Sequence, residues 1–165
     1  MWHAHRVTPA GRWPQEQCRG TLTLAFDDRH RRRIRLATDA GEPVVLDLPQ
    51  TAVLGDGDGL ALAEGGFLAV RAAAEDLVEV TAPTPDLLVR IAWHIGNRHI
   101  PAEIRGDRIL IRDDHVIVAM VQGLGAAVRR VRAAFTPEGG AYASPAHHDH
   151  HSHGHHDHEH AHDHD

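Results

Sequence analysis

The chain has 165 residues, the length of about one domain or of two small ones, and a net charge of −6. Residues 1–146 hold 17 arginines against 18 carboxylates, whereas residues 147–165 hold five carboxylates, no arginine and 11 of the 17 histidines. A nearly neutral body argues against a nucleic-acid partner, whose phosphates need a basic surface. No apolar segment has the length of a membrane span or the form of a signal peptide, so we expect a soluble cytoplasmic protein with no membrane partner.

Residues 1–75 predict a small all-β domain, because short apolar segments alternate with Gly and Asp turn signals and show no helical period. The predicted strands cover residues 21–26, 33–38, 44–48, 60–63 and 67–71. The basic run at residues 29–33 has two interpretations, a solvated hairpin loop or a docking patch for an acidic partner. Residues 56–59 begin like a calcium loop, but the later ligands are missing, which favours a plain turn.

Residues 76–137 predict a second domain in the order strand, helix, strand, strand, helix, strand, which is that of a ferredoxin-like unit in an α+β protein. Thr84 and Pro85 begin the first helix, Gly96 and Asn97 end it, and residues 113–114 cap the second. The residues predicted to face inward from the helices are Leu87, Leu88, Ile91, Ile95, Val116, Ile117, Met120 and Val121. Two helices cover one face of such a sheet, so we expect the other face to need a partner.

Residues 138–165 predict a disordered tail rich in His and Asp, because a small-residue linker precedes a segment with no apolar side chain larger than alanine. Its imidazoles suit Ni(II), Cu(II) and Zn(II), and the interleaved carboxylates argue against a purification tag. The predicted metal ligands here are His147, His148, His150, His151, His153, His155, His156, His158, His160, His162 and His164.

Three histidines of the second domain are further candidates for metal ligands. His94 lies at the edge of the apolar helical stripe, where a half-buried histidine with one hydrogen bond is an equal alternative. His99 lies beyond the predicted helix end, so its ring should not point the same way as that of His94. His115 follows two aspartates that could simply cap a helix and leave it in solvent. At the other end of the chain, the amine, two amides and the His3 imidazole could form a four-nitrogen plane for Cu(II) or Ni(II), although chance placement is the simpler interpretation.

The segment His94-Ile95-Gly96-Asn97-Arg98-His99-Ile100-Pro101 resembles the Gly-Asn-Arg-His signature of the urease accessory protein UreE family of nickel metallochaperones. Residues 113–116 resemble that family's second motif, and the order of β domain, second domain and histidine-rich tail extends the resemblance over the whole chain. The resemblance implies that His99 binds metal at a dimer interface together with its symmetry mate. In the second motif Asp113 stands where one form of the family has histidine, which leaves at most a weaker Asp113/His115 site.

The resemblance therefore implies a homodimer that binds Ni(II), and in vitro also Zn(II) or Cu(II), and delivers Ni(II) to apo-urease with the accessory GTPase. The first domain would contact proteins, the second would dimerise and bind metal, and the tail would collect metal. The alternative is a nickel or zinc storage or detoxification protein that works through its tail. No nucleophile-base pair, phosphate loop or buried carboxylate cluster is visible in the sequence, so we do not expect an enzyme.

Overall fold

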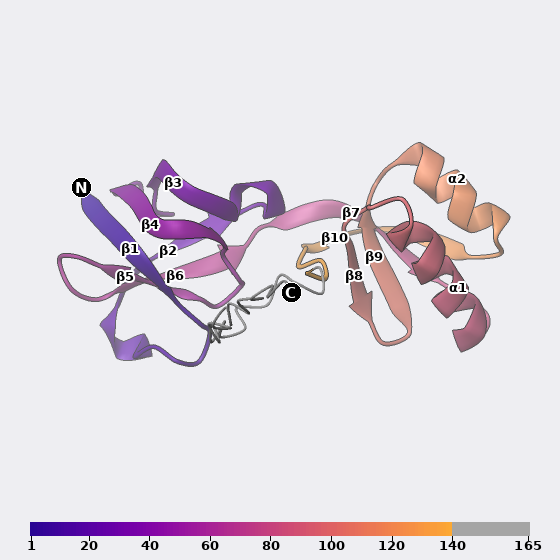
Figure 1. Cartoon of the computed structure of the whole chain (residues 1–165), viewed down its shortest axis with the longest axis horizontal. Helices are drawn as coiled ribbons and strands as arrows, with labels where there is room; N and C mark the ends of the chain where they lie inside the picture. The colour runs from indigo at the N-terminus through magenta and orange to yellow at the C-terminus, as the bar shows by residue number, and fades with distance from the viewer. Residues whose placement is uncertain (140–165) are drawn as a thin grey trace, which may run out of the picture.

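A computed structural model describes residues 1–139, and the predicted disordered tail, with its eleven candidate ligands, lies outside these residues apart from its first two positions. The described chain forms two lobes, an N-terminal lobe built of strands and a C-terminal lobe in which two helices pack on a sheet (Figure 1). Within residues 1–139 no helix is both long and apolar enough to cross a membrane.

The N-terminal lobe is a six-stranded sheet with the order β2-β6-β5-β1-β4-β3. Its strands are β1 (Trp2–Thr8), β2 (Cys18–Leu24), β3 (His30–Ala37), β4 (Pro43–Val53), β5 (Gly59–Leu62) and β6 (Phe67–Ala72). Two short 3-10 helices, η1 (Gln15–Gln17) and η2 (Phe26–Asp28), flank β2. The five predicted strands are all present, with shifted ends. The sheet is not built from hairpins alone, since β1 pairs parallel with β4 and β2 pairs parallel with β6.

Strand β1 was not predicted, yet it lies inside the sheet between β4 and β5. Its sequence is mostly polar, and Ala4 is its one fully buried residue. The strand also carries a β-bulge between Ala4 and Arg6, which breaks the alternation of inward and outward side chains. The pairing that makes it a strand comes from segments about 40 and 60 residues away, so no local pattern could indicate it.

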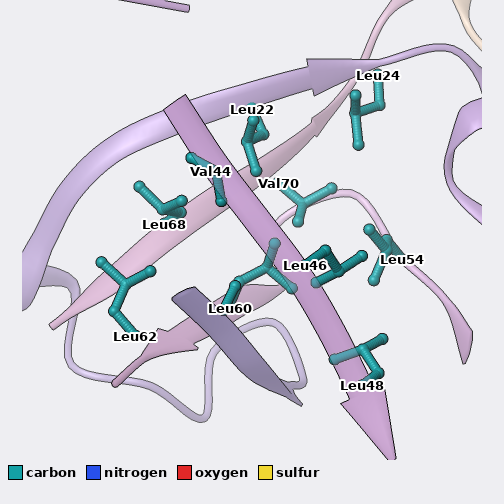
Figure 2. Packing of buried hydrophobic residues seen from close by; sticks show 11 residues of the cluster. Leu22, Leu24, Val44, Leu46, Leu48, Leu54, Leu60, Leu62, Leu68 and Val70 are labelled. Atoms are coloured by element: carbon teal, nitrogen blue, oxygen red, sulfur yellow. The ribbon is translucent and has the colours of Figure 1, made fainter. Parts of the chain in front are cut away.

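The core of this lobe consists of aliphatic side chains that come from β1, β2, β4, β5 and β6, and from Leu54 just after β4, and that converge between the strands (Figure 2). In β2 and β4 these residues recur at every second position, the period that places side chains on one face of a strand. The buried members are Ala4, Leu22, Leu24, Val44, Leu46, Leu48, Leu54, Leu60, Leu62, Leu68 and Val70.

The C-terminal lobe contains β7 (Ala74–Thr81), α1 (Pro85–Gly96), β8 (Ala102–Arg105), β9 (Arg108–Arg112), α2 (His115–Gly123) and β10 (Ala127–Ala134). Its four strands have the order β10-β7-β9-β8, and every neighbouring pair is antiparallel. The hydroxyl of Thr84 accepts a hydrogen bond from the Leu87 amide and caps α1, as the sequence predicts. The prediction that Val116 faces inward is wrong, since this first-turn residue of α2 is 60% exposed.

The two helices cover one face of this sheet, and the N-terminal lobe packs on part of the opposite face. Next to the N-terminal lobe, Phe26 of η2 packs on a cluster of Leu77, Leu110 and Phe135. Farther along the same face, Glu79 pairs with Arg129 and Arg108, and the hydrogen bond from Arg129, followed by that from Arg108, lowers the pKa of the Glu79 carboxyl. The N-terminal lobe thus supplies, within the same chain, part of the partner that this face was expected to need.

Arg29 joins the two lobes and is only 1% exposed. Its guanidinium donates hydrogen bonds to the carbonyl oxygens of Leu54 and Phe135 and lies over the ring of Phe26. Residues 30–33 belong to strand β3 and not to a loop, so the interpretation of run 29–33 as a solvated hairpin loop is wrong. A charged residue is rarely buried unless it is paired, which is why the sequence did not indicate this position.

Candidate metal site

His99 lies in the turn that follows α1. The Arg98 amide donates to the Ile95 carbonyl at 3.1 Å, and the His99 amide donates to the Gly96 carbonyl at 3.0 Å. These bonds end the helix, and His99 takes a φ of 55°, the left-handed conformation that is uncommon outside glycine. Among residues 1–139 no other non-glycine residue has a positive φ. The side chain is exposed, so this strained turn presents the imidazole to solvent.

His94 lies in the last turn of α1 and is partly buried, as its position on the helical stripe predicts. Its ring meets that of the neighbouring Trp93 edge to face, with 5.0 Å between centroids. Its carbonyl oxygen accepts a hydrogen bond from Arg98 at 3.1 Å. This hydrogen bond ties the Arg98 side chain to the last turn of α1, which contains His94 and directly precedes the turn with His99.

The second motif is organised around helix α2 and a salt bridge. Asp114 caps the helix, and its carboxylate accepts hydrogen bonds from the amides of Val116 and Ile117 at 2.8 and 3.2 Å. Asp113 instead pairs with Arg130 at 2.7 Å and raises the pKa of that guanidinium. His115 is exposed at the start of the helix. The carboxylate that an Asp113/His115 site would use is thus already bound to an arginine.

Within residues 1–139 no group of three or more His, Cys, Asp or Glu side chains is arranged to hold a metal ion. The structure therefore does not bring His94, His99 and His115 together into one site. A metal ion held by His99 and at least two further side chains would need ligands from a second copy of the chain or from residues 140–165. The eleven candidate tail histidines lie outside the described residues.

The exposed side of α1 carries large apolar side chains, a feature that the sequence interpretation missed. Val89 is 69% exposed and Trp93 is 64% exposed. They line a shallow groove with Leu87, Arg90, His94 and Leu124. Their spacing of four residues was the available signal, because it places them together on the side of the helix away from Ile91 and Ile95. Apolar side chains gathered on a surface commonly mark an interaction site.

Two of the four nitrogens of the possible N-terminal metal plane contact Glu64. Its carboxylate accepts a hydrogen bond from the His3 amide at 3.1 Å and contacts His3 Nδ1 at 2.8 Å. A four-nitrogen metal plane would require both of these His3 nitrogens to leave Glu64. The contact with the His3 ring, followed by the His3 amide, lowers the pKa of Glu64 to about 2.

The pKa of Glu64 predicts a specific acid dependence of stability. Because this pKa lies below its ordinary value of 4.5, ionised Glu64 stabilises the fold fully above about pH 4.5, and the contribution is lost as pH falls through about 2. We expect the difference in Tm between the original protein and Glu64→Gln to be largest near pH 6 and to vanish toward pH 2. Circular dichroism melts measure it, with Glu16→Gln as the control. A difference that stays constant from pH 6 to pH 2 would contradict the assignment.

The aspartates of the Gly-rich segment bind backbone amides. Asp58 accepts from Gly55 at 2.7 Å and from Ala10 at 3.0 Å, and burial raises its pKa. Asp56 accepts from Ala72 at 2.8 Å. These bonds fit the interpretation of residues 56–59 as a turn.

Comparison with known proteins finds matches along most of the chain. Residues 3–73 match the family model described as UreE urease accessory protein, N-terminal domain, and residues 75–164 match the model of the C-terminal domain. A urease accessory protein UreE of Bradyrhizobium sp. (strain BTAi1) is 50% identical over 147 residues, which cover 89% of this chain and 71% of the relative. The urease accessory protein UreE of Chelativorans sp. is 51% identical over 130 residues, which cover 79% of this chain and 82% of the relative. That of Beijerinckia indica is 43% identical over 152 residues, which cover 91% of this chain and 87% of the relative.

Proposed function

Since the chain belongs to the UreE family of urease accessory proteins, we propose that it binds Ni(II) and delivers it in the cytoplasm for assembly of the urease active site. The family consists of accessory proteins and not of enzymes, and the match confirms the resemblance carried by residues 94–101. Ni(II) is thus the cargo of the protein. The element order and strand order of the C-terminal lobe support its assignment to the ferredoxin-like class.

The observation that carries the proposal is His99, an exposed imidazole on a strained turn that belongs to no group of three or more candidate ligand side chains within residues 1–139. In a dimer with two-fold symmetry, a residue near the axis meets its own copy, so one histidine supplies two ligands. The remaining positions would be filled by histidines of residues 147–164. An incomplete set of ligands suits a donor of metal, because a ligand of the recipient can enter before the donor's ligands leave.

The exposed side of α1 is the surface that we assign to the dimer, because Val89 and Trp93 lie on the helix that ends next to His99. We expect Val89→Asp to turn the dimer into a monomer, since a carboxylate in an apolar interface loses its hydration without gaining a partner. Sedimentation velocity measures the change. Val53→Asp is the matched control, because Val53 is an exposed valine of the N-terminal lobe. A Val89→Asp protein that stays dimeric at micromolar concentration would place the interface elsewhere.

Metal selection should not come from the tail. Flexible imidazole ligands follow the Irving-Williams order and bind Cu(II) more tightly than Ni(II), with Zn(II) also bound. We therefore assign nickel delivery to the His99 site and metal collection to the tail. The N-terminal lobe would contact the urease accessory GTPase or apo-urease. Asp113 and His115, together with His94, are secondary ligand candidates at most, given the Asp113–Arg130 pair.

Urease activation across a series of nickel concentrations tests these roles. A chain truncated after Ala146 should lose most of its metal capacity but still activate urease when nickel is plentiful, and fail only when nickel is scarce. His99→Ala with the tail intact should show high capacity and impaired activation at every nickel level. The opposite pattern, with the truncated chain inactive throughout and His99→Ala normal, would favour a storage protein that works through its tail.

A further inference from the structure

Strand β3 concentrates positive charge at an edge of the N-terminal sheet. It is the last strand in the sheet order and pairs only with β4 (Figure 1). Ile34 and Leu36 pack against the core, so Arg33 and Arg35, which alternate with them, face outward. Arg32 lies where the register between β3 and β4 is irregular, and it is exposed as well. Within the span of residues 31–35 the arginines are Arg31, Arg32, Arg33 and Arg35.

The carboxylates near β3 neutralise only part of this charge. Arg31 pairs with Asp28 at 2.8 Å, and Arg33 pairs with Asp47 at 2.7 Å. Neither Arg32 nor Arg35, both exposed, forms an ion pair with any residue of the described range. The edge of the sheet therefore has a positive excess that is open to an acidic ligand.

The origin of the tail is tied to the start of this strand. Arg29, which directly precedes β3, donates to the carbonyl oxygen of Phe135, and the Glu138 amide donates to the Ala102 carbonyl at 2.8 Å. Glu138 is three residues from Phe135 and so at most about 11 Å from it. The eleven residues from Glu138 to Asp149 can span up to about 40 Å, and β3 is about 26 Å long. The acidic residues of the tail can therefore reach the strand.

We propose that residues 147–165, when free of metal, dock on β3 through their five carboxylates, and that metal loading releases them. Neutral imidazoles leave this segment with a charge of −5, which complements the arginines of β3. Each divalent ion adds two positive charges, so three bound ions reverse the sign of the segment. Attachment to the same chain raises its effective concentration at the strand. The release step rests on the proposed role of the tail as a metal collector.

Backbone amide NMR spectra of the metal-free full chain test the docking. Exposed charges are screened strongly at high salt, so the β3 amide signals should shift between about 20 mM and about 500 mM NaCl. Arg32→Gln/Arg35→Gln should abolish this shift. Arg6→Gln/Arg12→Gln is the matched control, because it removes the same charge from two exposed arginines of the same lobe, and it should leave the shift intact.

Zn(II) chloride, a diamagnetic stand-in for Ni(II), tests the release. Its addition at low salt should move the β3 signals to their high-salt positions. β3 signals insensitive to salt, or an unchanged shift in Arg32→Gln/Arg35→Gln, would overturn the docking. Loss of the shift on tenfold dilution would also overturn it, because it would show that the tail of a second copy is the ligand.

The NMR signals of the tail histidines distinguish a failure of metal-driven release from a failure of metal collection by the tail. If Zn(II) changes the signals of the tail histidines but not those of β3, the tail binds metal without leaving the strand. That result would overturn release and leave metal collection by the tail in place. If neither Zn(II) nor Ni(II) changes the signals of the tail histidines, the tail does not bind metal. That result would overturn both release and the collector role.

Discussion

Replacement of His99 by alanine should abolish the proposed tight Ni(II) site while leaving the fold and the proposed dimer intact. His99 is exposed, and the turn that holds it is made by backbone hydrogen bonds, so loss of the ring removes no buried contact. In the proposed dimer the substitution removes two imidazoles at once. We expect the affinity for Ni(II) to fall by about 100-fold or more, which corresponds to about 3 kcal/mol of binding free energy.

Isothermal titration calorimetry on a chain truncated after Ala146 isolates this site from the tail. The original sequence should bind one Ni(II) per dimer tightly, and His99→Ala should not. His99→Asn is a second variant, because asparagine tolerates the left-handed backbone and so preserves the turn. His115→Ala is the control and should bind as the original does. A tight site that survives in both His99 variants would move the primary ligand to His94 or His115.

Replacement of Phe135 by alanine should produce the largest loss of stability. Phe135 is fully buried, and its ring contacts Phe26 of the other lobe with 5.7 Å between centroids. It also lies under the guanidinium of Arg112, which in turn pairs with Asp27. Truncation removes this packing and leaves a cavity where the two lobes meet. We expect the free energy of unfolding to decrease by about 3–5 kcal/mol.

Urea denaturation monitored by circular dichroism measures this loss. Val53→Ala, which truncates an exposed side chain, should change the free energy of unfolding by no more than about 0.5 kcal/mol. A change of similar size for Phe135→Ala and Val53→Ala would mean that the contact between the lobes contributes little. Because Arg29 donates to the backbone carbonyl of residue 135, the hydrogen bond itself can persist in Phe135→Ala.

The features that the sequence determined by itself are local. The limits of α1 follow from the Thr84 cap and from residues 96–97, and α2 begins where Asp114 caps it. The signature at residues 94–101 was sufficient to predict the family. Helix periodicity, capping and a contiguous motif all depend on residues within a few positions of one another, so one sequence contains the whole signal.

The features that only the tertiary structure decided depend on distant partners. Strand β1 owes its place to pairing with β4 and β5, and Arg29 is buried because the carbonyl oxygens of Leu54 and Phe135 accept its hydrogen bonds. Likewise, Asp113 is removed from the predicted metal site by Arg130, 17 residues away. In each case the burial or pairing free energy comes from groups that folding brings together, and the spacing of residues along the chain does not encode it.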